Sequence, residues 1–317
     1  MLEQTRQDVS SPWHEGELAM QRSVGVVERM DGPGRNFVRK AMPEQHRAFF
    51  PMLPFLVLGA VDAKGDVWAT VRAGRPGFMS SPEPEVLDVR LPRDPADPAD
   101  SGMEDGDAIA MLGIQLETRR RNRLNGVIGR TYTGAFRVRV GQSFGNCPQY
   151  IQPRSSEFVR DPDVPTAMTP LHSGHLDDRT RRMIESADTF FVASYVDRED
   201  GERQVDVSHR GGYAGFVRVS AEGGLTIPDF SGNRFFNTLG NFLVNPKAGL
   251  VFVDFETGDM LQMTGRTEVL LDSPEITGFQ GAERLWRFTP EQIVLRPDSL
   301  PLRWRQESAE LQRRSRA

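Results

Sequence analysis

The chain has 317 residues, of which 38% are hydrophobic, enough to bury the core of one large domain or of two ordinary ones. A net charge of −5 gives no broad positive field for nucleic acid, and no stretch reaches the roughly 20 uncharged apolar residues of a membrane span. The opening residues have no apolar leader, and a single cysteine, Cys147, excludes an internal disulfide. We therefore expect a cytoplasmic protein without membrane or nucleic-acid partners.

Three segments of the first half recur in the second half in the same order. The matching pairs are 55–62 with 190–197, 65–79 with 203–217, and 113–126 with 252–265. The alignment sets Phe55 over Phe190 and Arg72 over Arg210. Each pair has the pattern of a buried strand or hairpin, so the repeat unit is a set of antiparallel hairpins.

The pattern of apolar residues predicts a mainly β fold of the α+β kind. Val205, Val207, Val217 and Val219 alternate with polar residues, and 250–255 is a nearly continuous apolar run that suits a strand buried on both faces. Short strands separated by Gly, Asp and Asn turns favour β-barrels with short flanking helices. The sequence therefore predicts two tandem, related barrels.

A segment rich in Pro, Asp and Ser separates the two copies and predicts a domain boundary near Pro165. We expect a first half over 1–164 that includes an N-terminal helical extension, and a second half over 165–317. Leu176, Met183 and Ile184 recur at helical spacing, and the two aspartates after Leu176 favour a helix N-terminus. A helix is therefore predicted at the start of the second half, packed on its barrel.

The second copy contains a candidate phosphate site. A polar loop with Gly232, Asn233 and Arg234 precedes a predicted amphipathic helix, whose free backbone N–H groups suit an anion. Arg210, which follows Ser208 on the neighbouring hairpin, can make a charge-assisted contact with the same anion. The alternative is that both arginines are surface residues beside ordinary turns.

The first copy differs from the second at this position. It keeps Arg72, but its loop over 94–107 carries six acidic residues that would repel a phosphate. We therefore expect the second copy to bind the anion and the first to be a degenerate, structural partner.

The strings DVSHRGG, IPDFSGNRFFNTLGN and SFGNCPQYIQ resemble the pyridoxamine 5'-phosphate oxidase-like flavin-nucleotide-binding proteins, over nearly the whole chain. The resemblance implies FMN in a groove between two split β-barrels, and a homodimer. It assigns the phosphate side to the strand and loop residues, followed by two asparagines on the helix: Ser208, Arg210, Asn233, Arg234, Asn237 and Asn241. The oxidases have an Arg-Lys pair where this chain has Asn233-Arg234, so vitamin B6 oxidation is not expected.

Several other side chains are candidates for chemistry. Cys147 lies between aromatic residues and would face the flavin or a substrate, or is a small buried hydrophobe. His209 lies in the predicted flavin strand, where it would bond the flavin, a substrate or its own neighbours. His172 and His175 have no carboxylate or thiolate cluster nearby, so no metal site is predicted. The arginine run at 119–123 is interpreted as a solvated hairpin tip.

We expect an FMN-dependent oxidoreductase that acts on a small-molecule substrate or electron donor. A flavin carrier without catalytic activity is an alternative. So is a split barrel that binds haem or a deazaflavin, because the fold alone does not choose among these functions.

Overall fold

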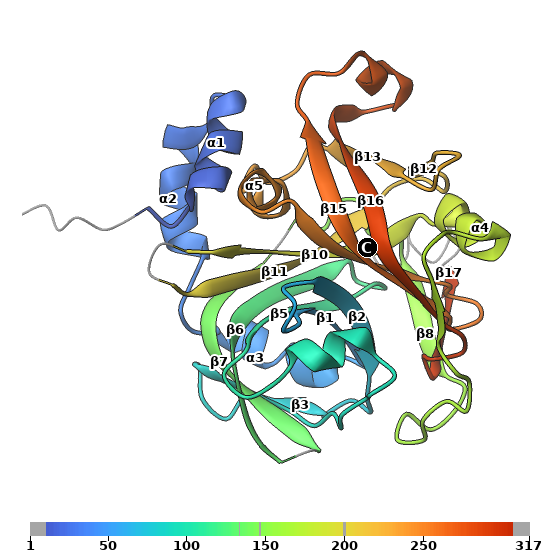
Figure 1. Cartoon of the computed structure of the whole chain (residues 1–317). Helices are drawn as coiled ribbons and strands as arrows, with labels where there is room; N and C mark the ends of the chain where they lie inside the picture. Colours follow the sequence, from blue (N-terminus) through green and yellow to red (C-terminus); the bar gives the residue numbers. More distant parts are fainter. Residues whose placement is uncertain (1–10, 133, 146, 199–200, 307–317) are drawn as a thin grey trace, which may run out of the picture.

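The computed structural model describes residues 11–132, 134–145, 147–198 and 201–306. Two curved antiparallel sheets dominate it, one in each half of the chain (Figure 1). The first sheet has the order β2-β1-β5-β6-β7-β4-β3. Its strands are β1 (Phe55–Val61), β2 (Val67–Ala73), β3 (Met79–Ser80), β4 (Val86–Val89), β5 (Ala108–Gln115), β6 (Arg120–Tyr132) and β7 (Ala135–Gly145).

The second sheet repeats this order strand for strand, as β11-β10-β14-β15-β16-β13-β12. Its strands are β10 (Thr189–Asp197), β11 (Arg203–Gly211), β12 (Arg218–Val219), β13 (Leu225–Phe230), β14 (Lys247–Val253), β15 (Met260–Leu270) and β16 (Ala282–Arg296), and β9 (Leu171–Ser173) pairs with β16. The predicted mainly β fold with a tandem repeat is therefore confirmed.

The strand registers define which residues are equivalent in the two halves. Irregularities in pairing occur at Gly126 in β6 and at Gly265 in β15, which are matched positions of the repeat. Arg72 pairs with Leu56, whereas Arg210 pairs with Phe190. Leu56, not Phe55, is thus the equivalent of Phe190, and the gapless alignment of the first strand was wrong by one residue. A one-residue shift matters because it moves a side chain to the other face of the sheet.

Three apolar clusters explain how the halves are held together. One cluster contains Leu56 and forms the core enclosed by the first sheet, and another contains Phe190 and forms the core enclosed by the second sheet. The third contains Val57 and Phe191, which point to the opposite face, and it lies between the two halves. The two sheets therefore pack against each other through residues that alternate with those of their own cores.

Short helices flank the sheets. They are α1 (Glu15–Ser23), α2 (Val27–Phe37), α3 (Glu44–Arg47), α4 (Asp178–Ser186) and α5 (Asn237–Val244), with 3₁₀ turns η1 (Phe50–Met52), η2 (Pro98–Gly102) and η3 (Pro274–Gly278). None of the helices in the described ranges has both the length and the apolar character to cross a membrane.

Helix α4 has the predicted place: Asp177 caps it, and Ile184 packs into the core of the second half. Helix α1, by contrast, belongs by sequence to the first half but packs on α5 of the second half (Figure 1). A Cβ on Gly16 of α1 would lie 2.1 Å from the carbonyl oxygen of Gly240, so only glycine permits this approach.

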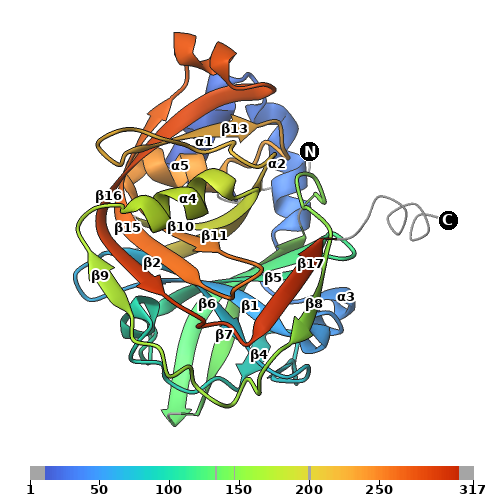
Figure 2. The same cartoon turned by 90° about the vertical axis from the view of Figure 1, so that its right-hand side faces the viewer.

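The ends of the two halves are joined by a small ribbon. β8 (Arg154–Phe158) follows the first sheet and pairs with β17 (Leu302–Gln306), which follows the second (Figure 2). The predicted boundary at Pro165 lies in the loop between β8 and β9.

Candidate functional site

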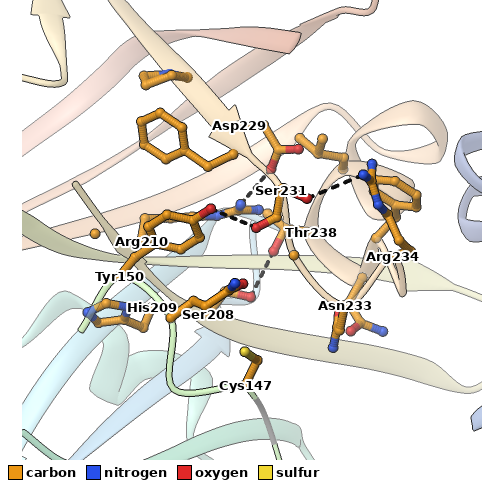
Figure 3. A pocket seen from close by; sticks show the side chains of 18 of the residues that line it. Cys147, Tyr150, Ser208, His209, Arg210, Asp229, Ser231, Asn233, Arg234 and Thr238 are labelled. Atoms are coloured by element: carbon orange, nitrogen blue, oxygen red, sulfur yellow. Dashed lines mark hydrogen bonds and ion pairs between the residues drawn. The ribbon is translucent and has the colours of Figure 1, made fainter. Parts of the chain in front are cut away.

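The main cavity lies where the second half faces the first. Strand β11 and the loop from β13 to α5 form one side of it, and β6 and the segment 147–150 close the other (Figure 3). Its volume is about 120 Å³. The polar lining includes Arg121, Arg123, Cys147, Ser208, His209, Arg210, Asp229, Asn233, Arg234, Asn237 and Thr238.

Arg210 extends from β11 into the cavity wall. Its Nη1 lies 2.7 Å from Oδ1 of Asp229, and the other oxygen of Asp229 accepts from Arg284 at 3.0 Å. Asp229 is thus shared by two guanidinium groups. The Nε–H of Arg210 is buried without a partner among the described residues.

Arg121 and Arg123 line the cavity as well, and their interpretation as part of a solvated hairpin tip was wrong. Arg123 is buried and bonds Asp206 at 2.7 Å and the hydroxyl of Ser208. Arg121 donates to Nδ1 of His209 at 3.1 Å and to the carbonyl oxygen of Cys147 at 2.6 Å. The two arginines are two residues apart on β6, so they point to the same face of the sheet.

Arg121 has an unusual electrostatic environment. Burial, together with the nearby charges of Arg123 and Arg210, lowers its pKa to about 9. Within the described parts of the chain, no carboxylate forms an ion pair with it. Its Nε–H and that of Arg123 are also buried without partners there. An anion in the cavity would relieve the repulsion among these arginines.

His209 is neutral in this environment. Burial and then the charges of Arg121 and Arg210 hold its pKa well below the ordinary 6.5. Because Arg121 donates to Nδ1, the ring proton resides on Nε2, which has no partner among the described residues. His209 therefore offers an unused hydrogen-bond donor at the cavity wall.

The loop before α5 has a strained backbone. Arg234 and Phe236 both adopt left-handed conformations, with φ of 63° and 62°. Such conformations cost roughly 1 kcal/mol or more for residues other than glycine and are concentrated at functional sites. Helix α5 begins directly afterwards, and no side chain in the described chain caps its N-terminus. Thr238 on its first turn bonds Ser208 at 2.8 Å.

The guanidinium of Arg234 is already paired. It makes two hydrogen bonds to Glu283, of 2.5 and 2.6 Å, and it lies beside Ser231 (Figure 3). Asn233 lines the cavity and accepts from the backbone of Phe235. Both predicted loop residues are thus at the site, but the charge of Arg234 is balanced by a carboxylate.

Asn237 and Asn241 differ in position. Asn237 lines the cavity and donates to the buried carboxylate of Glu17 in α1, whereas Asn241 lies behind the cavity and bonds Ser194 and His14. The structure therefore does not bring Asn241 together with the other predicted cofactor ligands. Burial raises the pKa of Glu17 to about 8, so at neutral pH α1 supports the site through a mostly protonated carboxyl group.

Cys147 lies between two spaces. It lines the main cavity from the side opposite Asp229, and it also lines a more open hollow of about 710 Å³ (Figure 3). This second hollow shares Arg121, Cys147 and Asn233 with the main cavity, and its apolar wall is formed by Met30, Pro33, Phe37, Pro148 and Phe235. The two spaces together could hold an anionic group and an attached apolar body.

The segment that carries Cys147 is fixed by contacts with the second half. The Tyr150 hydroxyl donates to the carbonyl oxygen of Ser231 at 2.8 Å, and its ring stacks on Phe230. A Cβ on Gly211 would lie 2.1 Å from the carbonyl oxygen of Tyr150, which explains the glycine at the end of β11.

His172 and His175 are exposed in and after β9, which pairs with β16, and neither lines the main cavity. The described residues include no group of three His, Cys, Asp or Glu side chains that could hold a metal ion.

No protein-family model matches the chain, and no curated protein matches it either. Several solved structures are similar to part of it. A protein of the pyridoxinephosphate oxidase family from Clostridium acetobutylicum is 17% identical and covers 40% of this chain and 92% of its own, with a TM-score of 0.25. An FMN-binding protein from Syntrophomonas wolfei is 13% identical and covers 38% and 86%, with a TM-score of 0.28. The haem storage protein HutZ from Vibrio cholerae is 19% identical and covers 39% and 95%, with a TM-score of 0.26.

Proposed function

We propose that the chain binds FMN, with the phosphate in the main cavity and the ring extending past Cys147 into the second hollow, and that it is a flavin-dependent oxidoreductase. The observation that carries the proposal is the group of three arginines, one buried and two half-buried, at a helix N-terminus that no side chain of the described chain caps. Arg121, Arg123 and Arg210 line a cavity that also meets the start of α5, and their Nε–H groups have no partner among the described residues. Such an arrangement suits a phosphate.

The sizes of the two spaces fit this division of the ligand. A cavity of about 120 Å³ accommodates a phosphate group with part of its linker, but not a three-ring flavin. The second hollow is larger and has an apolar wall, and it shares the lining residues Arg121, Cys147 and Asn233 with the cavity. Ligand sites are commonly apolar with a few fixed polar groups, as here.

When bound, FMN would supply the electron transfer, and the protein would supply binding, orientation and electrostatics. Arg123, Arg210 and the first turn of α5 would hold the phosphate. Neutral His209 would donate from Nε2, and the Arg121 guanidinium would place a positive charge at the junction of the two spaces. Cys147 would lie beside the ring, where a substrate or electron donor can approach through the open hollow.

The proposal is tested by titrating apoprotein with FMN and with riboflavin, following the quenching of flavin fluorescence. We expect FMN to bind at least about 100-fold more tightly than riboflavin, because a charged hydrogen bond contributes roughly 1.5–3 kcal/mol and several are made. Arg210→Gln, which removes a guanidinium assigned to the phosphate, should reduce that preference. Arg139→Gln, which removes an exposed arginine of β7, should leave it unchanged.

Purified protein should show a flavin absorption spectrum, and NADH or NADPH should bleach it if the protein is an oxidoreductase. A flavin spectrum that no nicotinamide donor bleaches would support the carrier function. Equal affinities for FMN and riboflavin, or a haem spectrum, would contradict the assignment of the cavity to a flavin phosphate.

A further inference from the structure

The buried carboxylate of Asp97 in the first half is surrounded by hydrogen-bond donors and a guanidinium group, as a bound anion would be. Asp97 precedes η2 and is almost completely buried. One of its oxygens accepts from Thr70 Oγ1 at 2.5 Å and lies 3.2 Å from Nη1 of Arg296. The other accepts from Gln262 Nε2 at 3.0 Å and from the backbone N–H of Ala99 at 3.1 Å. Three hydrogen-bond donors and the guanidinium group of Arg296 thus converge on one carboxylate.

Two of these donors are equivalents of residues in the main cavity. Thr70 precedes Arg72 by two residues on β2, as Ser208 precedes Arg210 on β11. Gln262 and Arg123 each lie three residues before the matched irregularities at Gly265 and Gly126. In the second half Asp206 bonds both Ser208 and Arg123, as Asp97 bonds both Thr70 and Gln262 in the first half.

The helical turns correspond as well. η2 lies between β4 and β5, and α5 lies between the equivalent strands β13 and β14. Asp97 caps η2 through the N–H of Ala99, whereas α5 has no side-chain cap within the described chain. The first half thus supplies a carboxylate to the start of its helical turn, and the described part of the second half supplies none to the start of α5.

The surrounding charges maintain Asp97 as an anion. Burial alone would raise its pKa, but Arg296 and Arg72, with the hydrogen bonds from Gln262 and Thr70, hold the pKa below its ordinary value. The neighbouring acids are matched to the same arginines, since Asp94 pairs with Arg296 and Asp100 with Arg72. This environment is that of an oxyanion site.

We propose that the first half retains a second oxyanion-binding site, related to the main cavity by the internal repeat, and that the carboxylate of Asp97 fills it in place of a phosphate group. The chain then has two equivalent sites but accepts one phosphate-bearing ligand. The inference depends on the proposed function only for the identity of the anion in the second half.

The test uses equilibrium dialysis of the full chain against radioactive inorganic phosphate. We expect about one phosphate bound per wild-type chain and one more in Asp97→Gly, which removes the internal anion and leaves space. Asp97→Asn is the matched control, because the amide removes the charge but fills the same place, and it should bind no additional phosphate. Should the glycine variant not fold, Asp97→Ser retains a hydroxyl for the Ala99 N–H and takes its place.

The phosphate bound by the wild-type chain tests the proposed function, and the additional phosphate bound by the variant tests the second site. A wild-type chain that binds no phosphate would contradict the proposed function, yet a gain of one in Asp97→Gly or Asp97→Ser would still support the second site. A folded variant without that gain would overturn the inference. So would a wild-type chain that binds two phosphates, because Asp97 would then not occupy the first-half site.

Discussion

Gly59 and Ala193 are equivalent residues of the two halves, and they lie against each other. Gly59 pairs with Ala110 of β5, and Ala193 pairs with Gly249 of β14, at matching points of the two sheets. A Cβ on Gly59 would lie 3.0 Å from the Cβ of Ala193. The halves are thus related by an approximate two-fold axis that passes between these two residues, and the candidate site lies at an interface formed within one chain.

The close contact makes Gly59 sensitive to added volume. Gly59→Val should lower the free energy of unfolding by about 1–3 kcal/mol, because overpacking forces the two sheets apart. Denaturant unfolding followed by tryptophan fluorescence measures this. Gly129→Ala is a suitable control, since a Cβ there would meet only the carbonyl oxygen of Arg137, at 3.9 Å. Equal stabilities for Gly59→Val and the wild type would argue against tight packing at the axis.

Glu17 should make stability fall as pH rises above neutrality. Its pKa is raised from 4.5 to about 8 by burial, so the folded chain binds a proton that the unfolded chain has lost. This contribution to the free energy of unfolding is complete below pH 4.5 and is lost as pH rises through 8, and it amounts to at most about 5 kcal/mol. His14 and His46, whose pKa values burial lowers to about 4, act in the opposite direction, but only up to about pH 6.5.

The effect of Glu17 on the free energy of unfolding is therefore separated from that of the histidines between pH 6.5 and 8.5. Denaturant unfolding across it should show a declining free energy of unfolding for the wild type and a nearly constant one for Glu17→Gln, which resembles the protonated acid. Parallel curves for the two proteins would show that Glu17 is ionised in the folded state.

The cysteine offers a direct probe of ligand position, because Cys147 is the only cysteine in the chain. It is half-buried and lines both spaces of the candidate site. FMN should slow its reaction with a thiol reagent by about tenfold or more, since the thiolate must be accessible to react. A phosphate ligand that lacks the isoalloxazine ring, such as ribitol 5-phosphate, should protect Cys147 less.

Cys147→Ser should fold and keep its affinity for FMN within about twofold, because the phosphate donors lie on other residues. Loss of FMN binding in this variant would mean that Cys147 is part of the binding groove itself. A labelling rate that FMN does not change would mean that Cys147 lies away from the flavin.

The sequence was sufficient to predict the repeat, because strands, turns and glycines recur at nearly constant offsets. It also placed Ser208, His209, Arg210, Asn233 and Arg234 around one space. It could not predict Arg121 and Arg123, because their partners His209 and Asp206 are in the other half and local composition favours a solvated turn. Their alternation on β6 was the one available signal. The resemblance also assigned Asn241, which bonds Ser194 and His14 behind the cavity, and its role in cofactor binding stays a prediction.

The two equivalent arginines should separate ligand binding from stability. Arg210→Ala should weaken FMN binding about 10- to 100-fold, since it removes a charge-assisted donor worth roughly 1.5–3 kcal/mol, while Asp229 stays paired with Arg284. Arg72→Ala should leave FMN affinity nearly unchanged. Arg72 donates to the carbonyl oxygen of Pro92 at 2.7 Å and lies 3.6 Å from Asp100, so it stabilises the loop of its own half.

The readouts should therefore be reversed between the two variants: Arg72→Ala lowers the Tm of the apoprotein, and Arg210→Ala lowers the affinity for FMN. Fluorescence titration of both variants, with flavin counted per chain and Tm measured without ligand, provides the comparison. One flavin per chain and unequal losses of affinity are expected. Two flavins per chain, or equal losses from both substitutions, would mean that both halves hold a flavin phosphate and that the acidic loop of the first half does not exclude it.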